Sequence, residues 1–114
     1  ASSWPAGAAI VGSAYGEMFA ALAPDRAEGA RRLGREIGLS RVVCRMNWPG
    51  DVTDGTTLGQ RLFAAEAILP AFIADLEAAR AEVAEARAAG LGNPGCAAER
   101  RALLQAGRGA TSAP

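Results

Sequence analysis

Four polar residues in the middle of the sequence have types and spacing that could bind an anion. Arg41 carries a planar guanidinium whose donors suit a phosphate-like oxyanion, and Ser40 adds a hydroxyl donor beside it. Asn47 and Asp51 are four residues apart and would share a face of a helix. Asp51 also precedes a long apolar pattern, which predicts that it is a helix N-cap. A purely structural interpretation stays open, with Arg41 at a helix end and Asp51 only capping.

The composition favours a helical protein with balanced charge. The 114 residues are enough for one domain with a modest core, or for part of a larger one. Half of the residues are hydrophobic but only 5% are aromatic, so alanine and leucine supply most of the apolar side chains, which predicts an all-α fold. Twelve basic residues, all arginine, balance twelve acidic ones. This neutrality gives no electrostatic reason to expect a nucleic-acid partner.

The sequence lacks histidine, which removes the commonest general base and the commonest metal ligand. We therefore predict no metal and no cofactor. The two cysteines, Cys44 and Cys96, are too few for a zinc site and too far apart for a Cys-x-x-Cys redox pair. They could form one disulfide, worth roughly 4 kcal/mol in the chain-entropy account. The alternative is two free, buried thiols.

The N-terminal apolar segment is not predicted to cross a membrane. Residues 5–23 are rich in alanine and glycine, but they include Ser13 and Glu17 and fall short of twenty clean apolar positions. No basic residues precede this segment, so it does not have the pattern of a signal peptide. We expect the chain to begin in the middle of a domain.

Helical periodicity predicts a first helix from about Pro5 to Leu22, with a broad apolar face that is mostly buried. This face comprises Ile10, Val11, Ala14, Tyr15, Met18, Phe19 and Leu22. The glycines at positions 7, 12 and 16 weaken the helix, so we interpret them as places where a neighbouring backbone comes close.

The second predicted helix, capped by Asp25, has an inner stripe and a charged outer face. The inner stripe consists of Ala30, Leu33 and Ile37. The outer face carries Arg26, Arg31, Arg32 and Arg35 interleaved with Glu28 and Glu36. This mixture favours a solvated helix face over an anion-binding patch.

Three further helices are predicted, from Asp51 to Leu69, from Pro70 onward and from Cys96 to Ala106. The fourth packs by a seam of Phe72, Leu76, Ala79 and Val83, and the fifth turns Leu103 and Leu104 inward. We divide the chain into residues 1–89 as the main domain, residues 90–106 as a C-terminal helix tied back by the disulfide, and residues 107–114 as a flexible tail.

Two segments resemble motifs of the PAP2 superfamily, whose soluble members include the bacterial class A acid phosphatases. Ser40-Arg41, five residues, Asn47, three residues and Asp51 have the spacing of the family's last box. Ser3-Trp4-Pro5-Ala6-Gly7-Ala8 resembles a Pro-Ser-Gly-His box that opens a helix. The resemblance covers roughly residues 1–89 and implies the C-terminal half of a PAP2-type helical bundle, because the family's first box, with a lysine and an arginine, would lie upstream.

The resemblance assigns a phosphate cradle. It implies that Arg41, Ser40 and the backbone of Gly7 bind phosphate oxygens, and that Asp51 orients the nucleophile. At these four positions the sequence matches the family pattern.

The sequence departs from the family at the reacting groups. Ala8 replaces the histidine that acts as general acid, Asn47 replaces the nucleophilic histidine, and Ala6 replaces a phosphate donor. An alanine cannot donate a proton, and an amide nitrogen is a poor nucleophile. The resemblance with these departures predicts a pseudo-phosphatase with a residual oxyanion pocket.

Two other functions stay open. The chain could be an active phosphomonoester hydrolase completed by a separate N-terminal chain, with Asp51 or Glu17 as base. It could also be a small helical interaction module with a coincidental motif. The resemblance further implies a partner chain or a homo-oligomer, and a periplasmic or secreted location, since the soluble family members are exported.

Overall fold

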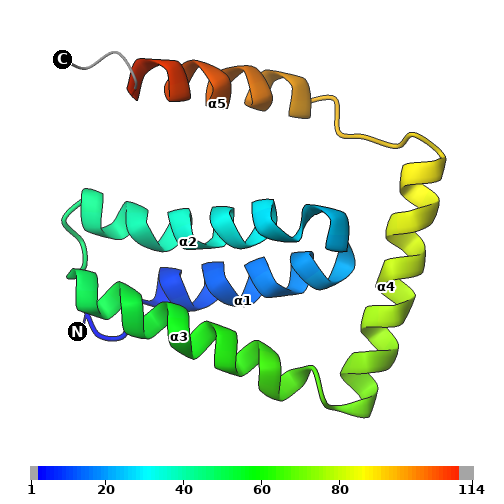
Figure 1. Cartoon of the computed structure of the whole chain (residues 1–114), viewed down its shortest axis with the longest axis horizontal. Coiled ribbons are helices and arrows are strands. Elements are labelled where there is room, and N and C mark those ends of the chain that lie inside the picture. The colour runs from blue at the N-terminus through cyan, green and yellow to red at the C-terminus, as the bar shows by residue number, and fades with distance from the viewer. Residues whose placement is uncertain (1–2, 111–114) are drawn as a thin grey trace. The chain divides into compact units, whose positions relative to one another are not determined.

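The computed structural model describes residues 3–110, with side-chain burial for residues 3–105. Over this range the fold is all-α, as predicted, and contains no strand. Figure 1 shows the helices in chain order. They are α1 (Gly7–Leu22), a 3₁₀ turn (Pro24–Arg26), α2 (Ala27–Val43), α3 (Pro49–Glu66), α4 (Pro70–Ala88) and α5 (Cys96–Ala110). None of these helices is long and apolar enough to span a membrane.

The chain forms two compact units, Ala1–Val83 and Ala84–Pro114. The first contains α1, α2, α3 and most of α4, and the second contains the end of α4 and α5. The domain boundaries inferred from the sequence stay predictions. Helix α5 continues to Ala110, past the expected end at Ala106, and residues 111–114 of the expected tail lie outside the described residues.

Helix α1 is the central helix of the first unit. It lies between α2 and α3 and contacts both along its length (Figure 1). The start of α1, the end of α2 and the start of α3 meet at one end of this layer. A backbone hydrogen bond of 3.0 Å from the Ala6 N–H to the Asp51 carbonyl joins the starts of α1 and α3.

Glycines allow α1 and α2 to touch through their backbones. A Cβ atom on Gly12 would lie 2.6 Å from the Gly34 carbonyl oxygen, and one on Gly16 would lie 3.2 Å from the Ala30 carbonyl oxygen. The predicted close approach is therefore confirmed for these two glycines. It is wrong for Gly7, around which a Cβ would meet nothing within 4 Å.

The same device joins α1 to α3. A Cβ on Gly55 would lie 2.7 Å from the Ala6 carbonyl oxygen, and one on Gly59 would overlap the Ser13 hydroxyl and the Ile10 carbonyl. The buried apolar side chains are correspondingly small, namely Ala6, Ala9, Ala20 and Val52. Backbone contact, more than large side chains, fills the centre of this unit.

The predicted burial of the large apolar side chains is wrong for much of α1 and α2. Val11, Tyr15 and Phe19 on α1 are exposed, as are Leu33 and Ile37 on α2. Where glycine faces glycine, the helices come too close for a large side chain to lie between them, so these residues are displaced to the margin. All of them except Val11 line an apolar groove of about 190 Å³, together with Gly12, Gly16 and Gly34.

Helix α4 begins at Pro70 as predicted and contacts α3 and α1 through a few residues. The rings of Phe63 and Phe72 pack edge to face, with centroids 5.9 Å apart. The Arg80 Nε donates a 2.8 Å hydrogen bond to the Ala21 carbonyl. The predicted seam of α4 is half-buried. In α5, however, Leu103 and Leu104 are exposed, so their predicted inward orientation is wrong.

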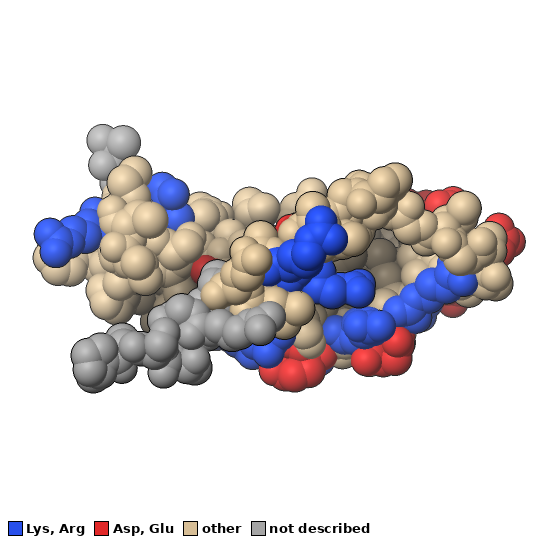
Figure 2. All heavy atoms as spheres, turned by 90° about the horizontal axis from the view of Figure 1, so that it is seen from above, with Lys and Arg blue, Asp and Glu red and all other residues tan. Residues whose placement is uncertain are grey.

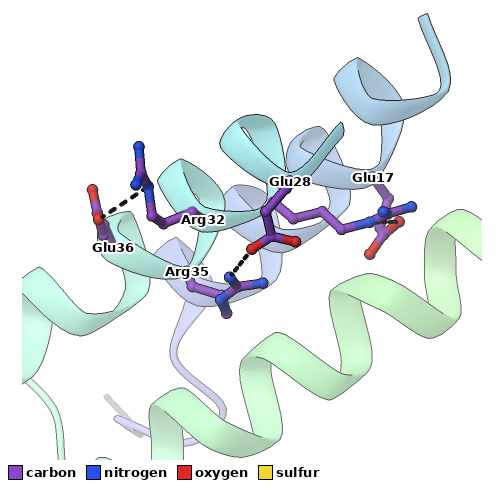
Figure 3. A network of polar contacts seen from close by, with 6 residues as sticks. Glu17, Glu28, Arg32, Arg35 and Glu36 are labelled. Carbon is purple, nitrogen blue, oxygen red and sulfur yellow. Dashed lines mark hydrogen bonds and ion pairs between the residues drawn. The ribbon is translucent and has the colours of Figure 1, made fainter. Parts of the chain in front are cut away.

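The outer face of α2 is a network of ion pairs, which confirms the predicted solvated charged face (Figure 3). Arg31 bonds Glu17 at 3.0 Å, Arg35 bonds Glu28 at 3.1 Å, and Arg32 lies 3.8 Å from Glu36. Exposed pairs of this kind contribute about 0.2–1 kcal/mol each. Figure 2 shows arginine and carboxylate groups close together on the face drawn, in keeping with the zero net charge.

Candidate oxyanion site

The two sequence motifs lie together at the end of the first unit. The Asn47 Nδ2 donates a 2.8 Å hydrogen bond to the Ser3 carbonyl, and the Trp4 Nε1 donates a 2.7 Å hydrogen bond to the Asp54 carboxylate. The backbone bond from Ala6 to Asp51 continues this contact. Segments more than forty residues apart in the sequence therefore form one surface.

Asp51 caps α3 from inside the helix, which corrects the prediction that it is the N-cap. The helix begins at Pro49, whose ring fixes φ near the helical value, and Trp48 is the N-cap. The Asp51 Oδ2 accepts a 3.0 Å hydrogen bond from the Trp48 N–H, as the third helical residue does in a capping box. Asp51 is only 8% exposed. This carboxylate therefore holds the start of α3, and among the described residues no hydrogen bond joins it to Asn47.

Asn47 is half-buried in the turn between α2 and α3. Its amide nitrogen donates to the Ser3 carbonyl, so it fastens the N-terminal segment to this turn. A conjugated amide that donates in this way is a structural link, and the delocalised lone pair of its nitrogen makes it a poor nucleophile towards phosphorus.

The predicted cradle residues on α2 behave differently from one another. The Ser40 hydroxyl donates a 2.6 Å hydrogen bond to the Ile37 carbonyl one turn earlier, so its proton is used within the helix. Arg41 is half-buried, and no hydrogen bond or ion pair engages its guanidinium among residues 3–105, whose side chains the structure describes. Arg41 is thus a free donor group in the described part, whereas Ser40 is not.

The predicted groups on α1 are also separated. Gly7 is the first residue of α1 and is exposed, and Ala8 beside it is half-buried. Glu17, which we considered as a base, instead pairs with Arg31 on the charged face of α2 (Figure 3). Glu17 is therefore not part of the candidate site.

The end of α2 is a Schellman turn with an arginine in the left-handed conformation. The Met46 N–H donates to the Arg41 carbonyl at 2.8 Å, and the Arg45 N–H donates to the Val42 carbonyl at 2.9 Å. Arg45 has a φ of 58°, a position usually taken by glycine. The sequence analysis missed this residue, because arginine is not a residue type that indicates a left-handed backbone.

A cavity of about 420 Å³ opens beside this turn. Its wall consists of Ser3, Val42 and residues 45–49. Of the predicted site residues only Asn47 lines it, and Arg41, Ser40, Gly7, Ala8 and Asp51 do not. The wall combines one guanidinium, from Arg45, with the indole of Trp48 and the start of α3, whose dipole favours negative charge.

The cysteines do not form the expected disulfide. Cys44 and Cys96 are both free, exposed thiols. They lie in different compact units, Cys44 at the end of α2 and Cys96 at the start of α5. Within the described residues no group of three or more cysteine, aspartate or glutamate side chains could hold a metal ion.

Over the described residues the chain is all-helical, and a cavity whose lining includes Arg45 and Trp48 lies where α2 ends and α3 begins. The sequence is 35% identical over 81 residues to the non-specific acid phosphatase of Salmonella typhimurium, covering 71% of this chain and 32% of that protein. It is 34% identical over 85 residues to the acid phosphatase of Zymomonas mobilis, covering 75% of this chain and 32% of that protein. The Salmonella typhi non-specific acid phosphatase is 33% identical over 81 residues.

The chain is therefore acid phosphatase-like, which confirms the resemblance inferred from the motifs. It spans about a third of the length of the curated relatives that it matches. No family model matches the sequence, and no solved structure matches it.

Proposed function

We propose that this chain is a pseudo-phosphatase of the PAP2 type, which binds an oxyanion and has a structural or binding role. The observation that carries the proposal is the junction of the two motifs through Asn47 and the Ser3 carbonyl. That junction supports a common ancestry with the acid phosphatase site, and the residue types at its centre do not support turnover. A PAP2-type bundle is the fold that we propose for the complete domain.

The chemistry of the replaced residues argues against phosphate-ester hydrolysis. Ala8 has no proton to give to a leaving group, and general acid catalysis typically contributes a factor of about 10² to 10⁴. The Asn47 amide is a poor nucleophile and is bonded to the Ser3 carbonyl. Loss of the acid and of the nucleophile removes both halves of the reaction.

Charge complementarity supports retained anion binding. The Arg41 guanidinium is half-buried and unpaired within the described residues, whereas three arginines on the outer face of α2 each contact a glutamate. Arg41 lies in the last turn of α2, and α3 begins after a short turn. A guanidinium near a helix start is suited to a phosphate or another oxyanion.

The test is phosphate release from p-nitrophenyl phosphate together with phosphate binding measured by calorimetry. We expect no release above background from the full chain, and we expect Arg41→Ala to weaken phosphate binding at least about tenfold, as loss of a charge-assisted hydrogen bond does. Arg32→Ala, which removes an exposed charge from the same helix, is the control and should bind as the wild type does. Hydrolysis of p-nitrophenyl phosphate by the wild type that is lost in Arg41→Ala would contradict the proposal.

The second candidate is an active phosphomonoester hydrolase completed by another chain. It is favoured because the relatives are acid phosphatases and this chain spans only about a third of their length. It is disfavoured by the two bases considered for it, because Asp51 is buried as a helix cap and Glu17 is ion-paired. Hydrolysis that appears only when the upstream part of a relative is added would support this candidate.

We also propose that a partner chain or a second copy covers the exposed apolar side chains of α1 and α2. Tyr15 and Phe19 with Leu33 and Ile37 line one groove, and Val11 is exposed on the same helix as the first two, an unusual concentration for a surface in water. We expect sedimentation velocity to show association, and Phe19→Glu to reduce it. A monomer at all concentrations would contradict this. We further propose a periplasmic or secreted location, which the resemblance to the PAP2 superfamily supports.

A further inference from the structure

Arg45 occupies a backbone conformation that arginine rarely adopts. Its φ of 58° is in the left-handed region, where a side chain with a Cβ costs roughly 1 kcal/mol relative to glycine. The Schellman hydrogen bonds of the turn involve only backbone groups, so they do not require a guanidinium. A residue kept in such a conformation is a candidate for a functional role.

Arg45 lines the 420 Å³ cavity. No hydrogen bond or ion pair of its guanidinium occurs among residues 3–105, whose side chains the structure describes. On the outer face of the preceding helix, α2, by contrast, Arg31, Arg32 and Arg35 all contact glutamates. The charge of Arg45 is therefore available to a ligand in the cavity.

An aromatic side chain forms another part of the same wall. Trp48 is 75% exposed, although tryptophan is usually well buried, and it lines the cavity with Arg45. Its backbone N–H is fixed by Asp51, so the residue is held at the start of α3. An exposed indole offers a flat surface on which an aromatic ring can stack. The cavity is in the size range of small-molecule sites and is much larger than a single phosphate ion needs.

We infer that this cavity binds an anion that carries a planar aromatic group, with the anionic oxygens on Arg45 and the ring against Trp48. This inference rests on the proposed function for the oxyanion and adds Arg45 and Trp48 as the residues that select the ligand. It does not depend on Arg41, which is absent from the cavity wall.

The test uses phenylphosphonate, whose carbon–phosphorus bond is not hydrolysed by phosphatases, with inorganic phosphate and benzyl alcohol as comparison probes. Calorimetry on the full chain should show phenylphosphonate binding more tightly than phosphate, and no binding of benzyl alcohol. Arg45→Gly should weaken phenylphosphonate at least about tenfold. Trp48→Leu should weaken phenylphosphonate about three- to tenfold and leave phosphate unchanged.

The Arg45→Gly variant keeps the fold, because glycine favours the left-handed conformation, and its melting temperature should equal or exceed that of the wild type. Arg45→Asn, which also tolerates this conformation, is a second variant that should lose binding in the same way. Arg32→Ala is the charge control and should bind as the wild type does.

Several results would overturn the inference. The first is that the wild type does not bind phenylphosphonate. The second is that the Arg45→Gly or Arg45→Asn variant binds it as tightly as the wild type does. The third is that Trp48→Leu lowers the affinities for phenylphosphonate and for phosphate by the same factor. Loss of phosphate binding in Arg41→Ala but not in Arg45→Gly would leave the proposed function standing and this inference wrong. Hydrolysis of p-nitrophenyl phosphate would count against the proposed function alone.

Discussion

Substitution of Gly34 by alanine is expected to destabilise the first unit by about 1 to 3 kcal/mol. A Cβ atom on Gly34 would overlap the Gly12 carbonyl oxygen and lie 3.1 Å from the Gly12 carbonyl carbon. These are backbone atoms inside α1, so they cannot rotate away as a flexible side chain would. Relief of the overlap requires α1 and α2 to separate, which opens space along the contact. Urea unfolding followed by circular dichroism measures the loss.

Gly29→Ala is the matched control on the same helix. A Cβ on Gly29 would meet nothing within 4 Å, so the substitution adds no collision. Alanine in a helix is favoured over glycine by about 0.5 to 1 kcal/mol, and Gly29→Ala should therefore stabilise the protein. Equal stability of the two variants would show that α1 and α2 are not in backbone contact.

Asp51→Ala is expected to lower the free energy of unfolding by about 1 to 2 kcal/mol. The substitution removes the carboxylate that accepts the Trp48 N–H at 3.0 Å, at a position that is almost fully buried. It also removes a negative charge from the first turn of α3, where the helix dipole favours one. Thermal and urea unfolding of the purified variant measure the effect.

Two variants separate the cap from other contributions. Asp51→Asn keeps an acceptor oxygen but loses the charge, so it should lie between the wild type and Asp51→Ala. Asp54→Ala removes an exposed carboxylate that bonds the Trp4 indole and should cost only about 0.5 kcal/mol. A loss in Asp51→Ala no larger than that in Asp54→Ala would refute the capping role.

Local patterns in the sequence were enough to predict the helices. Pro70 at the first position of α4 and the pairing of arginines with glutamates on α2 are properties of neighbouring residues, and both are confirmed. The glycines at positions 12 and 16 also had only one physical explanation inside a helix, and the structure bears it out. The acid phosphatase relationship was predictable because motif spacing is itself a local property.

The burial of side chains between two helices could not be predicted from local patterns in this way. Periodicity places Val11 and Phe19 on an apolar face, but it cannot show that glycines of α2 occupy the centre of the contact and leave both exposed. The start of α3 was misplaced because Asp51 is a good N-cap residue, whereas Pro49 at the first position sets the helix earlier. Arg45 was missed because nothing in its type indicates a left-handed backbone.

The backbone contacts between α1 and its two neighbours also bear on how the cavity responds to change. Side chains between two helices can change rotamer when one helix shifts, so they absorb part of the movement. A glycine packed against a backbone carbonyl has no side chain that could adjust in this way. We therefore expect a displacement imposed near Gly59 in α3 or Gly16 in α1 to move that helix as a rigid body, including the end of the helix that lies beside the cavity. Ser3 and Asn47 are joined by a hydrogen bond and both line the cavity, so such a movement would change the width of the cavity opening.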